Sequence, residues 1–131
     1  MKKIGRNEKI SFPDLGIQLI DCKIDTGAFG TSLHVDGILV RDNKLIFWIG
    51  HKKNRFTFTK YKVIKVKSSF GRIQERYTIR TRMIIGSRTY KIFVSLTDRK
   101  KMRFPCLVGR RFLYKFGYVV DVRKKNIYGK S

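Results

Sequence analysis

The chain has 131 residues, a length that suits one domain with a modest core and is short for two. Its hydrophobic fraction of 42% and aromatic fraction of 13% are typical of folded globular proteins and exclude a disordered tail. The 31 Lys and Arg residues against 9 Asp and Glu residues give a formal net charge of +22, so nucleic acid, ribosomes and other acidic partners have to be considered.

The first residues are basic and lack the apolar stretch of a signal peptide. No apolar run in the chain approaches the roughly 20 residues that a membrane helix needs. The two cysteines, Cys22 and Cys106, are too few for a disulfide framework, and we expect both to be reduced and in or near the core. These features predict a cytoplasmic protein that has no membrane partner.

Period-two alternation of apolar and polar residues predicts strands along most of the chain. In chain order, the expected strands are 17–24, 45–49, 56–58, 77–82 and 90–96, with turn signals at 42–43, Gly50, 68–71 and 86–87. One helix is expected over 110–116, closed by Gly117. Short strands at this spacing predict an all-β class, a small barrel or sandwich, as a single domain over residues 1–131.

Asp25 differs from the other acidic residues in its surroundings. It follows the expected strand 17–24 and precedes Thr26 and Gly27, so it lies where a strand breaks into a tight loop. The triplet Asp-Thr-Gly alone is weak evidence, but peptide hydrolysis by carboxylates has a specific requirement. Two carboxylates must share one proton, so that one acts as base on a water while the other polarises the scissile carbonyl.

The chain has only one such Asp, so the second must come from another copy across a twofold axis. Thr26 can form a hydrogen bond across that axis, and Gly27 lets the backbone approach both the substrate and the partner copy. A second segment follows about eighty residues later, where the apolar pair Leu107-Val108 leads into Gly109, Arg110 and the expected helix.

These segments, in this order, carry a resemblance to a known family. The matching stretches are 4–8, 23–28 with 31–34, 67–71 with 75–76, 96–99, Met102, 104–105, 107–110 and 120–121. Over nearly the whole chain they resemble a prokaryotic family of small retropepsin-like aspartic peptidases (RimB-like). Some members are associated with RimK-type ligases, and the family was formerly labelled as ATP-dependent zinc proteases.

The resemblance implies a retropepsin-like acid protease barrel with one short C-terminal helix, active as a homodimeric aspartic endopeptidase. The implied site residues are the catalytic Asp25, Thr26 and Gly27, the substrate-binding Ala28, Ser68, Ser69, Phe70 and Gly71, and the supporting Gly109 and Arg110. The tip of a flap hairpin is expected at 68–72. Viral-type enzymes have a second acid four residues beyond the catalytic Asp, but here Phe29 takes that position. Either Arg110 has another partner, such as Asp98 or Asp121, or the dimer is held differently.

No cofactor or metal is expected, in spite of the former family label. The chain has no glycine-rich Lys-Ser/Thr loop for ATP phosphates and no His-Glu-x-x-His pair for zinc. Zinc needs three or four convergent ligands, and the candidates His34, His51, Cys22 and Cys106 are scattered singly.

Two other functions remain open at this point. The first is a catalytically silent retropepsin-like domain that serves as an interaction module. The second is a basic β-barrel that binds RNA or ribosomes, supported by the charge and by aromatic residues that could stack on bases. The alternation of the aromatics argues against the second function, since it puts most of them, Trp48 among them, in the core.

Overall fold

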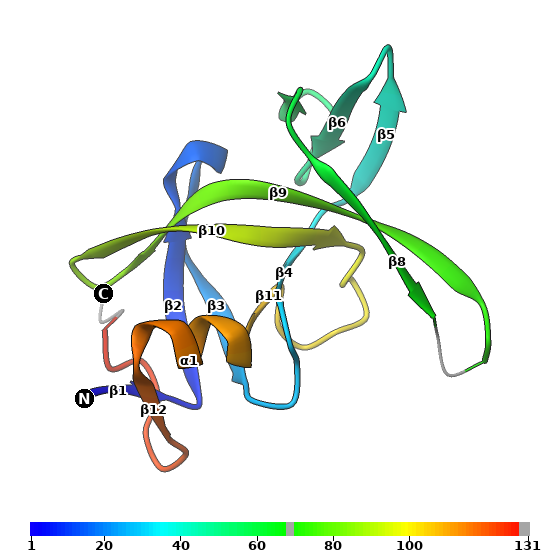
Figure 1. The fold of residues 1–131 in the computed structure, drawn as a ribbon. Helices are drawn as coiled ribbons and strands as arrows, with labels where there is room; N and C mark the ends of the chain where they lie inside the picture. The colour runs from blue at the N-terminus through cyan, green and yellow to red at the C-terminus, as the bar shows by residue number, and fades with distance from the viewer. Residues whose placement is uncertain (68–69, 129–131) are drawn as a thin grey trace.

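The computed structural model describes residues 1–67 and 70–128, and strands make up most of it (Figure 1). Six strands close into a barrel in the order β10-β4-β11-β3-β2-β9, because β9 pairs back onto β10. Their bounds are β2 Asn7–Phe12, β3 Ile17–Asp25, β4 Thr31–His34, β9 Ile73–Ile85, β10 Arg88–Thr97 and β11 Cys106–Gly109. The expected all-β barrel is therefore confirmed.

The barrel interior is filled by alternate side chains of its strands, as the period-two pattern predicted. Ile79 and Met83 of β9 and Val94 of β10 are fully buried. Cys22 and Cys106 lie opposite each other on the parallel strands β3 and β11; both are buried and free, as expected. Burial, helped by the hydrogen bond with Cys106, raises the pKa of the Cys22 thiol.

A long hairpin leaves the barrel as an arm (Figure 1). It is formed by β8 Lys62–Lys67 and the first half of β9, paired from Lys62 opposite Thr78 to Lys67 opposite Ile73. The expected flap residues Ser68 and Ser69 lie outside the described residues. Phe70 next to them is 90% exposed, and Gly71 has the positive φ of +81° that the predicted turn requires.

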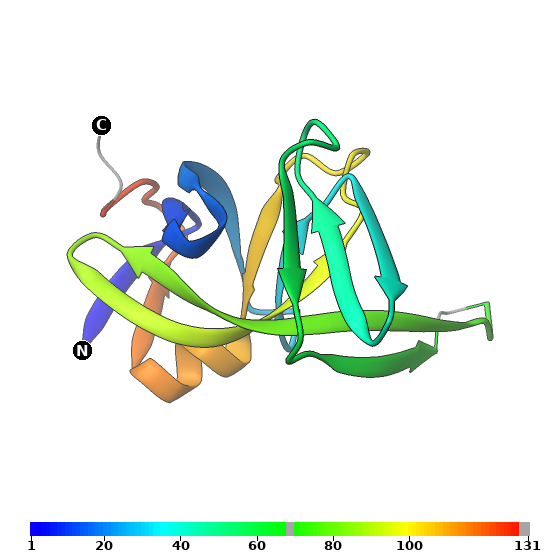
Figure 2. The same cartoon turned by 90° about the horizontal axis from the view of Figure 1, so that it is seen from above.

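Three further strands form a separate antiparallel sheet that projects from the barrel (Figures 1 and 2). They are β5 Gly37–Arg41, β6 Lys44–Trp48 and β7 Arg55–Phe58. One face is buried, where the Phe47 ring stacks on Phe56 and Phe58 with centroids 5.4 and 5.7 Å apart. Trp48 is half-buried on the other face, because neighbouring residues of a strand point to opposite sides, so the core position expected for it is wrong.

The expected helix is present as α1 Arg110–Phe116, directly after β11. It ends at Gly117, which adopts a left-handed φ of 70° and donates its N–H to the carbonyls of Leu113 and Tyr114. A short 3-10 turn, η1 Pro13–Leu15, joins β2 to β3. No helix in the described ranges 1–67 and 70–128 is long and apolar enough to cross a membrane.

The first and last strands, β1 Lys2–Gly5 and β12 Tyr118–Asp121, pair in parallel as a two-stranded sheet beside the barrel. The carboxylate of Glu8 holds this region together from a fully buried position. It accepts hydrogen bonds from the backbone N–H groups of Gly5 at 2.8 Å, Ile127 at 3.1 Å and Tyr128 at 3.0 Å. A buried carboxylate is costly unless it is hydrogen-bonded, so these three donors explain how Glu8 is tolerated in the core.

Candidate active site

Asp25 is the last residue of β3, opposite Gly109 on the parallel strand β11. Its side chain is 26% exposed. The Gly27 N–H donates to Asp25 Oδ1 at 3.0 Å, and the Ala28 N–H donates to the Asp25 carbonyl at 3.2 Å. These bonds close a tight turn that holds the carboxylate at the surface of the loop. Lys23, on the same side of the strand, brings its Nζ to 3.9 Å from Asp25 Oδ2.

The segment β11–α1 lies directly against this loop. The backbone N–H of Arg110 donates to the Ala28 carbonyl at 2.8 Å, and Arg110 Nη1 donates to the Gly27 carbonyl at 3.1 Å. A Cβ on Gly109 would come within 2.3 Å of the Gly30 carbonyl oxygen, closer than side chains approach backbone. Gly109 and Arg110 therefore lie directly against the loop that contains Asp25.

Phe29 is 60% exposed and has two arginines over its ring. The guanidinium carbons of Arg110 and Arg111 lie 5.5 and 5.8 Å from the ring centroid. Such cation–π contacts contribute about 0.5–1 kcal/mol each at exposed sites. In this chain the partners of Arg110 are therefore the Gly27 carbonyl and the Phe29 ring. Of the two acids considered for it, Asp121 pairs with Arg123, and Asp98 accepts the Lys100 N–H at 3.0 Å.

A cavity of about 1300 Å³ begins at the residues that follow the loop and extends along β9, β10 and α1. Ala28 belongs to its lining, but Asp25 lies just outside it. The charged lining residues are the cations Arg76, Arg80, Lys91, Arg99, Arg111 and Lys115 and the acids Asp36, Glu75 and Asp98. Because cations outnumber acids here, the potential of the cavity favours an anionic ligand.

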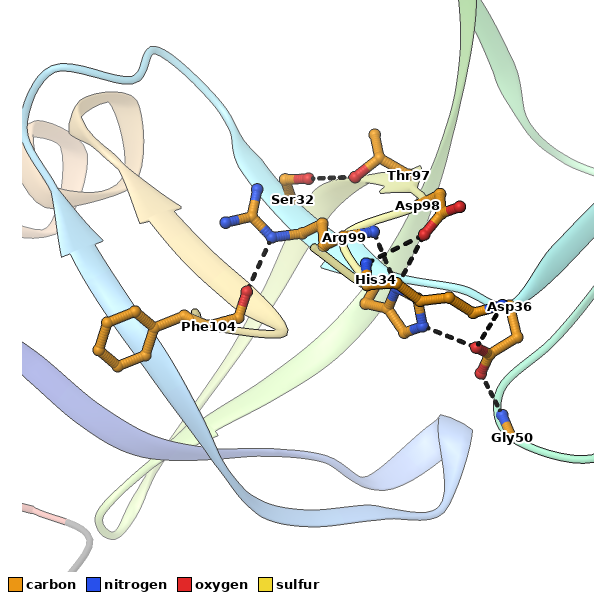
Figure 3. A network of polar contacts seen from close by, with 9 residues as sticks. Ser32, His34, Asp36, Gly50, Thr97, Asp98, Arg99 and Phe104 are labelled. Atoms are coloured by element: carbon orange, nitrogen blue, oxygen red, sulfur yellow. Dashed lines mark hydrogen bonds and ion pairs between the residues drawn. The ribbon is translucent and has the colours of Figure 1, made fainter. Parts of the chain in front are cut away.

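Asp36 and Arg99 of the cavity lining belong to a polar network with His34 and Gly50 (Figure 3). The Arg99 backbone N–H donates to His34 Nδ1 at 2.8 Å, and His34 Nε2 lies 2.9 Å from Asp36 Oδ1. Because Nδ1 accepts a hydrogen bond, this arrangement fits a neutral imidazole with its proton on Nε2. Asp36 Oδ2 in turn accepts the Gly50 N–H, so the network joins β4, the segment after β10 and the three-stranded sheet.

Sequence reasoning missed several of these contacts. Lys23 could have been found, because residues two apart on a strand share a face. The His34–Asp36–Arg99 network could not, since it joins segments 65 residues apart. Within residues 1–67 and 70–128, no three His, Cys, Asp or Glu side chains gather where they could hold a metal ion.

A closed six-stranded barrel with an Asp-Thr-Gly loop at the end of one strand, supported by a Gly-Arg segment and a short helix, defines a retropepsin-like acid protease fold. Residues 3–131 match the profile of the family described as RimB-like, retropepsin-like aspartic endopeptidase RimB, and the chain belongs to this family.

The chain is also similar to two named relatives and to one solved structure. The chain is similar to proteins named "Probable alpha-L-glutamate ligase" from Desulfotalea psychrophila, at 29% identity over 83% of the chain, and from Parasynechococcus marenigrum, at 28% identity over 82%. It spans only about a quarter of the length of these relatives, 26% and 25%. A crystal structure of a protein of unknown function from Legionella pneumophila superimposes with a TM-score of 0.75 at 26% identity, covering 97% of this chain and 98% of that one.

Proposed function

We propose that the chain is an aspartic endopeptidase whose active site forms from two copies of Asp25 across a twofold axis. The observation that supports this proposal most directly is the position of the Asp25 carboxylate, which the Gly27 N–H holds at the surface of the loop. The groups that contact this carboxylate in the described part of the chain are the Gly27 N–H and the Lys23 ammonium, and neither residue is an acid. A dyad therefore requires a second chain.

The reaction follows from the properties of such a pair. Two carboxylates in hydrogen-bond reach cannot both ionise, so they hold one proton between them and titrate as a coupled unit. The ionised group takes a proton from a water, which attacks the scissile carbonyl, while the protonated group donates to the carbonyl oxygen. Thr26 and Gly27 are exposed in the single chain and are thus available to the partner's loop.

The β8–β9 hairpin is the element suited to cover a bound peptide. It extends beyond the barrel, and two apolar side chains near its end, Phe70 and Ile73, are 90% and 69% exposed. Exposed apolar groups at the end of a hairpin are suited to pack on a ligand or a second chain. An extended substrate between hairpin and loop would add a strand and present alternate side chains to pockets.

The preferred substrate is proposed to be an acidic peptide, rich in glutamate. Six cations against three acids in the cavity favour anionic side chains, and two of the acids, Asp36 and Asp98, are already hydrogen-bonded. The relatives that contain a similar stretch are named for glutamate ligation. A peptidase domain that occurs in such a protein would meet glutamate-containing products.

The decisive experiment is cleavage of a mixed peptide library by the purified protein between pH ~3 and ~8. Asp25→Asn should abolish cleavage. The matched control Asp21→Asn removes an acid from the same strand, whose side chain is exposed and paired with Lys9, and should leave cleavage intact. A folded, dimeric parent without any cleavage would instead favour the silent interaction module. Cleavage that survives in Asp25→Asn would reject the aspartic mechanism.

The substrate preference has its own test. Paired peptides that differ only in Glu against Gln should be cleaved with different kcat/KM, and the ratio should fall toward one as salt rises. Arg111→Gln with Lys115→Gln, which removes two cations of the cavity, should lower this ratio several-fold. Lys124→Gln with Lys125→Gln, which removes the same charge from an exposed segment near the end of the chain, should not. Equal ratios in both double variants would contradict the preference.

A further inference from the structure

The three-stranded sheet has a second face that the proposed peptidase activity does not use. Ile38 of β5 lines the large cavity, whereas the next residue, Leu39, points to the opposite side. There a separate groove of about 250 Å³ is lined by Leu39, Arg41, Ile46, Trp48, Lys52 and Arg55. We refer to these six residues as the outer groove. Three of the six are cations and none is an acid.

Trp48 is the aromatic floor of the outer groove. It lies opposite Gly37 on β5, and its ring occupies the space of the missing side chain, since a Cβ on Gly37 would fall 1.9 Å from a ring carbon. Covering a strand glycine explains why an aromatic residue is present at this position. It does not explain the cations around the ring, where Lys52 Nζ lies 5.7 Å from the ring centroid.

The loop between β6 and β7 fixes the position of Lys52. The Asn54 N–H donates to the His51 carbonyl at 2.8 Å, and the Lys53 N–H donates to His51 Nδ1 at 3.2 Å. Arg55 Nε donates to the Lys52 carbonyl at 3.3 Å. The Arg55 guanidinium therefore lies against the Lys52 backbone, and both residues line the groove together with Trp48.

The charge of the whole sheet agrees with that of the groove. Between residues 37 and 58 the sequence has five Lys and Arg residues, Arg41, Lys44, Lys52, Lys53 and Arg55, against the single acid Asp42. Asp42 lies at the β5–β6 turn, away from the groove lining. A face of one sign beside an apolar and aromatic surface is complementary to a ligand that carries both anionic and planar groups.

We propose that the outer groove binds single-stranded nucleic acid. One base stacks on Trp48, displacing the exposed Lys52 ammonium from the ring, and the phosphates on either side contact Lys52, Arg55 and Arg41. An acidic peptide would satisfy the cations but would leave the indole and the apolar residues Leu39 and Ile46 without a planar partner. The site is separate from Asp25 and does not depend on peptidase activity.

The fluorescence of Trp48 can report binding directly, because Trp48 is the only tryptophan in the sequence. Oligouridylate and oligodeoxyuridylate of about twelve nucleotides, a length within the usual range for single-strand sites, are titrated into the Asp25→Asn protein. A glutamate peptide of equal charge serves as the comparison. We expect saturable quenching of tryptophan fluorescence by an oligonucleotide and none by the peptide, and the tighter of the two oligonucleotides identifies RNA or DNA as the ligand. Equal quenching by the peptide, or no quenching at all, overturns the proposal.

Variants then separate the groove from the general charge. Binding of a labelled oligonucleotide, followed by anisotropy, should weaken about tenfold in Lys52→Gln with Arg55→Gln. The slope of log affinity against log salt should become shallower by about 1.4, since each lost phosphate contact contributes about 0.7. The control Lys124→Gln with Lys125→Gln should change neither the affinity nor the slope. If the control loses as much affinity as the groove variant, the net charge of the protein alone binds the oligonucleotide.

Stacking is tested independently of charge. Trp48→Leu should weaken binding by about fivefold to a hundredfold, because base–aromatic stacking has this strength, while Trp48→Phe should retain most of it. The thermal unfolding of both variants is recorded alongside, because the ring also covers Gly37. If both folded variants bind as the parent does, Trp48 is only a cover for the glycine and the proposal is wrong.

Discussion

At the scale of single residues, the position of Asp25 depends on groups that take no part in the proposed chemistry. Its carboxylate accepts one backbone N–H from Gly27, and the carbonyls of Gly27, Ala28 and Phe29 are all held by α1 through its first two residues. Hydrogen bonds from α1 thus fix the loop at three successive residues, 27–29. A preorganised carboxylate needs no rearrangement when the second copy and the substrate arrive.

A substitution at Gly109 tests whether the segment β11–α1 supports the Asp25 loop. A Cβ there would collide with the carbonyl oxygens of Gly30 at 2.3 Å and Phe29 at 2.6 Å, so backbone has to move. We expect Gly109→Ala to lower the free energy of unfolding by roughly 2–3 kcal/mol, as overpacking does, and to reduce kcat strongly. Gly30→Ala is the matched control, because a Cβ at Gly30 meets nothing within 4 Å; its effect should stay within about 0.5 kcal/mol. Urea unfolding measures the change in the free energy of unfolding for each of the two variants. Equal changes in Gly109→Ala and Gly30→Ala would contradict the role of Gly109 in supporting the loop.

Residue-level prediction from sequence succeeded where the determinants are local. Asp25 and Gly27 form a turn within three residues, and Gly117 ends α1 with the positive φ that its position predicted. No prediction was made for the burial of Glu8, since the sequence around it has no sign that this residue is fully buried. The donors that make its burial possible include Ile127 and Tyr128, more than a hundred residues away in the chain. No short-range pattern carries that information.

At the scale of elements, the attachment of the three-stranded sheet depends on Asp36. This carboxylate accepts the Gly50 N–H and a hydrogen bond from His34, and Asp36 also donates its own N–H to the Trp48 carbonyl at 2.9 Å. The Gly50 N–H, followed by the His34 imidazole, lowers the pKa of the Asp36 carboxyl below its usual value. The ionised form is therefore the one that holds the sheet to β4.

The sign of the pH dependence follows from that shift. A carboxyl whose pKa is lower in the folded state stabilises the fold above its unfolded pKa, near 3.8, and loses this contribution as pH falls through the lower folded value. Asp36→Asn should thus reduce the free energy of unfolding by about 1 kcal/mol at neutral pH, with the difference from the parent disappearing toward pH ~2. Denaturant titrations at the two pH values measure it. A difference independent of pH would mean that the charge of Asp36 is not involved.

Element prediction was correct for the strands that it named, but it missed others and did not show which sheet each strand joins. The strands expected at 17–24, 45–49 and 56–58 correspond to β3, β6 and β7, and the helix at 110–116 is α1. The sequence did not show that β6 and β7 leave the barrel with β5. Short alternating strands have the same pattern whichever sheet they join, because one buried face produces period two in both. Six strands were missed: β1, β2, β4, β5, β8 and β12. Three of these, β1, β4 and β12, have only four residues, which is a short stretch in which to detect a period.

At the scale of the whole molecule, the first and last strands pair with each other within one chain. β1 pairs with β12 in parallel, and Glu8 ties the segment 127–128 to the start of β2. A homodimer built on the Asp25 loops can therefore form while β1 and β12 stay paired within each chain. The parts left exposed for a second copy are the loop itself, with Thr26 and Phe29, and the apolar end of the β8–β9 hairpin.

The shared site makes a quantitative prediction about mixtures. If each active site needs Asp25 from two chains, a parent chain paired with an Asp25→Asn chain is inactive. Parent protein allowed to exchange subunits with a threefold excess of the variant should then retain about a quarter of its activity, because only about a quarter of parent chains meet another parent chain. The activity per chain should also fall on dilution below the dissociation constant of the dimer.

The control for this experiment is Asp25→Asn that also carries Gly109→Ala, whose displaced loop should no longer pair. An excess of that double variant should leave the parent's activity nearly unchanged. Full activity in the presence of the single variant, once exchange has been shown by mixing differently tagged chains, would mean that one chain suffices for catalysis. The second carboxylate would then have to be sought within the chain, and the symmetric pair would be abandoned while the barrel and its loop remain as described.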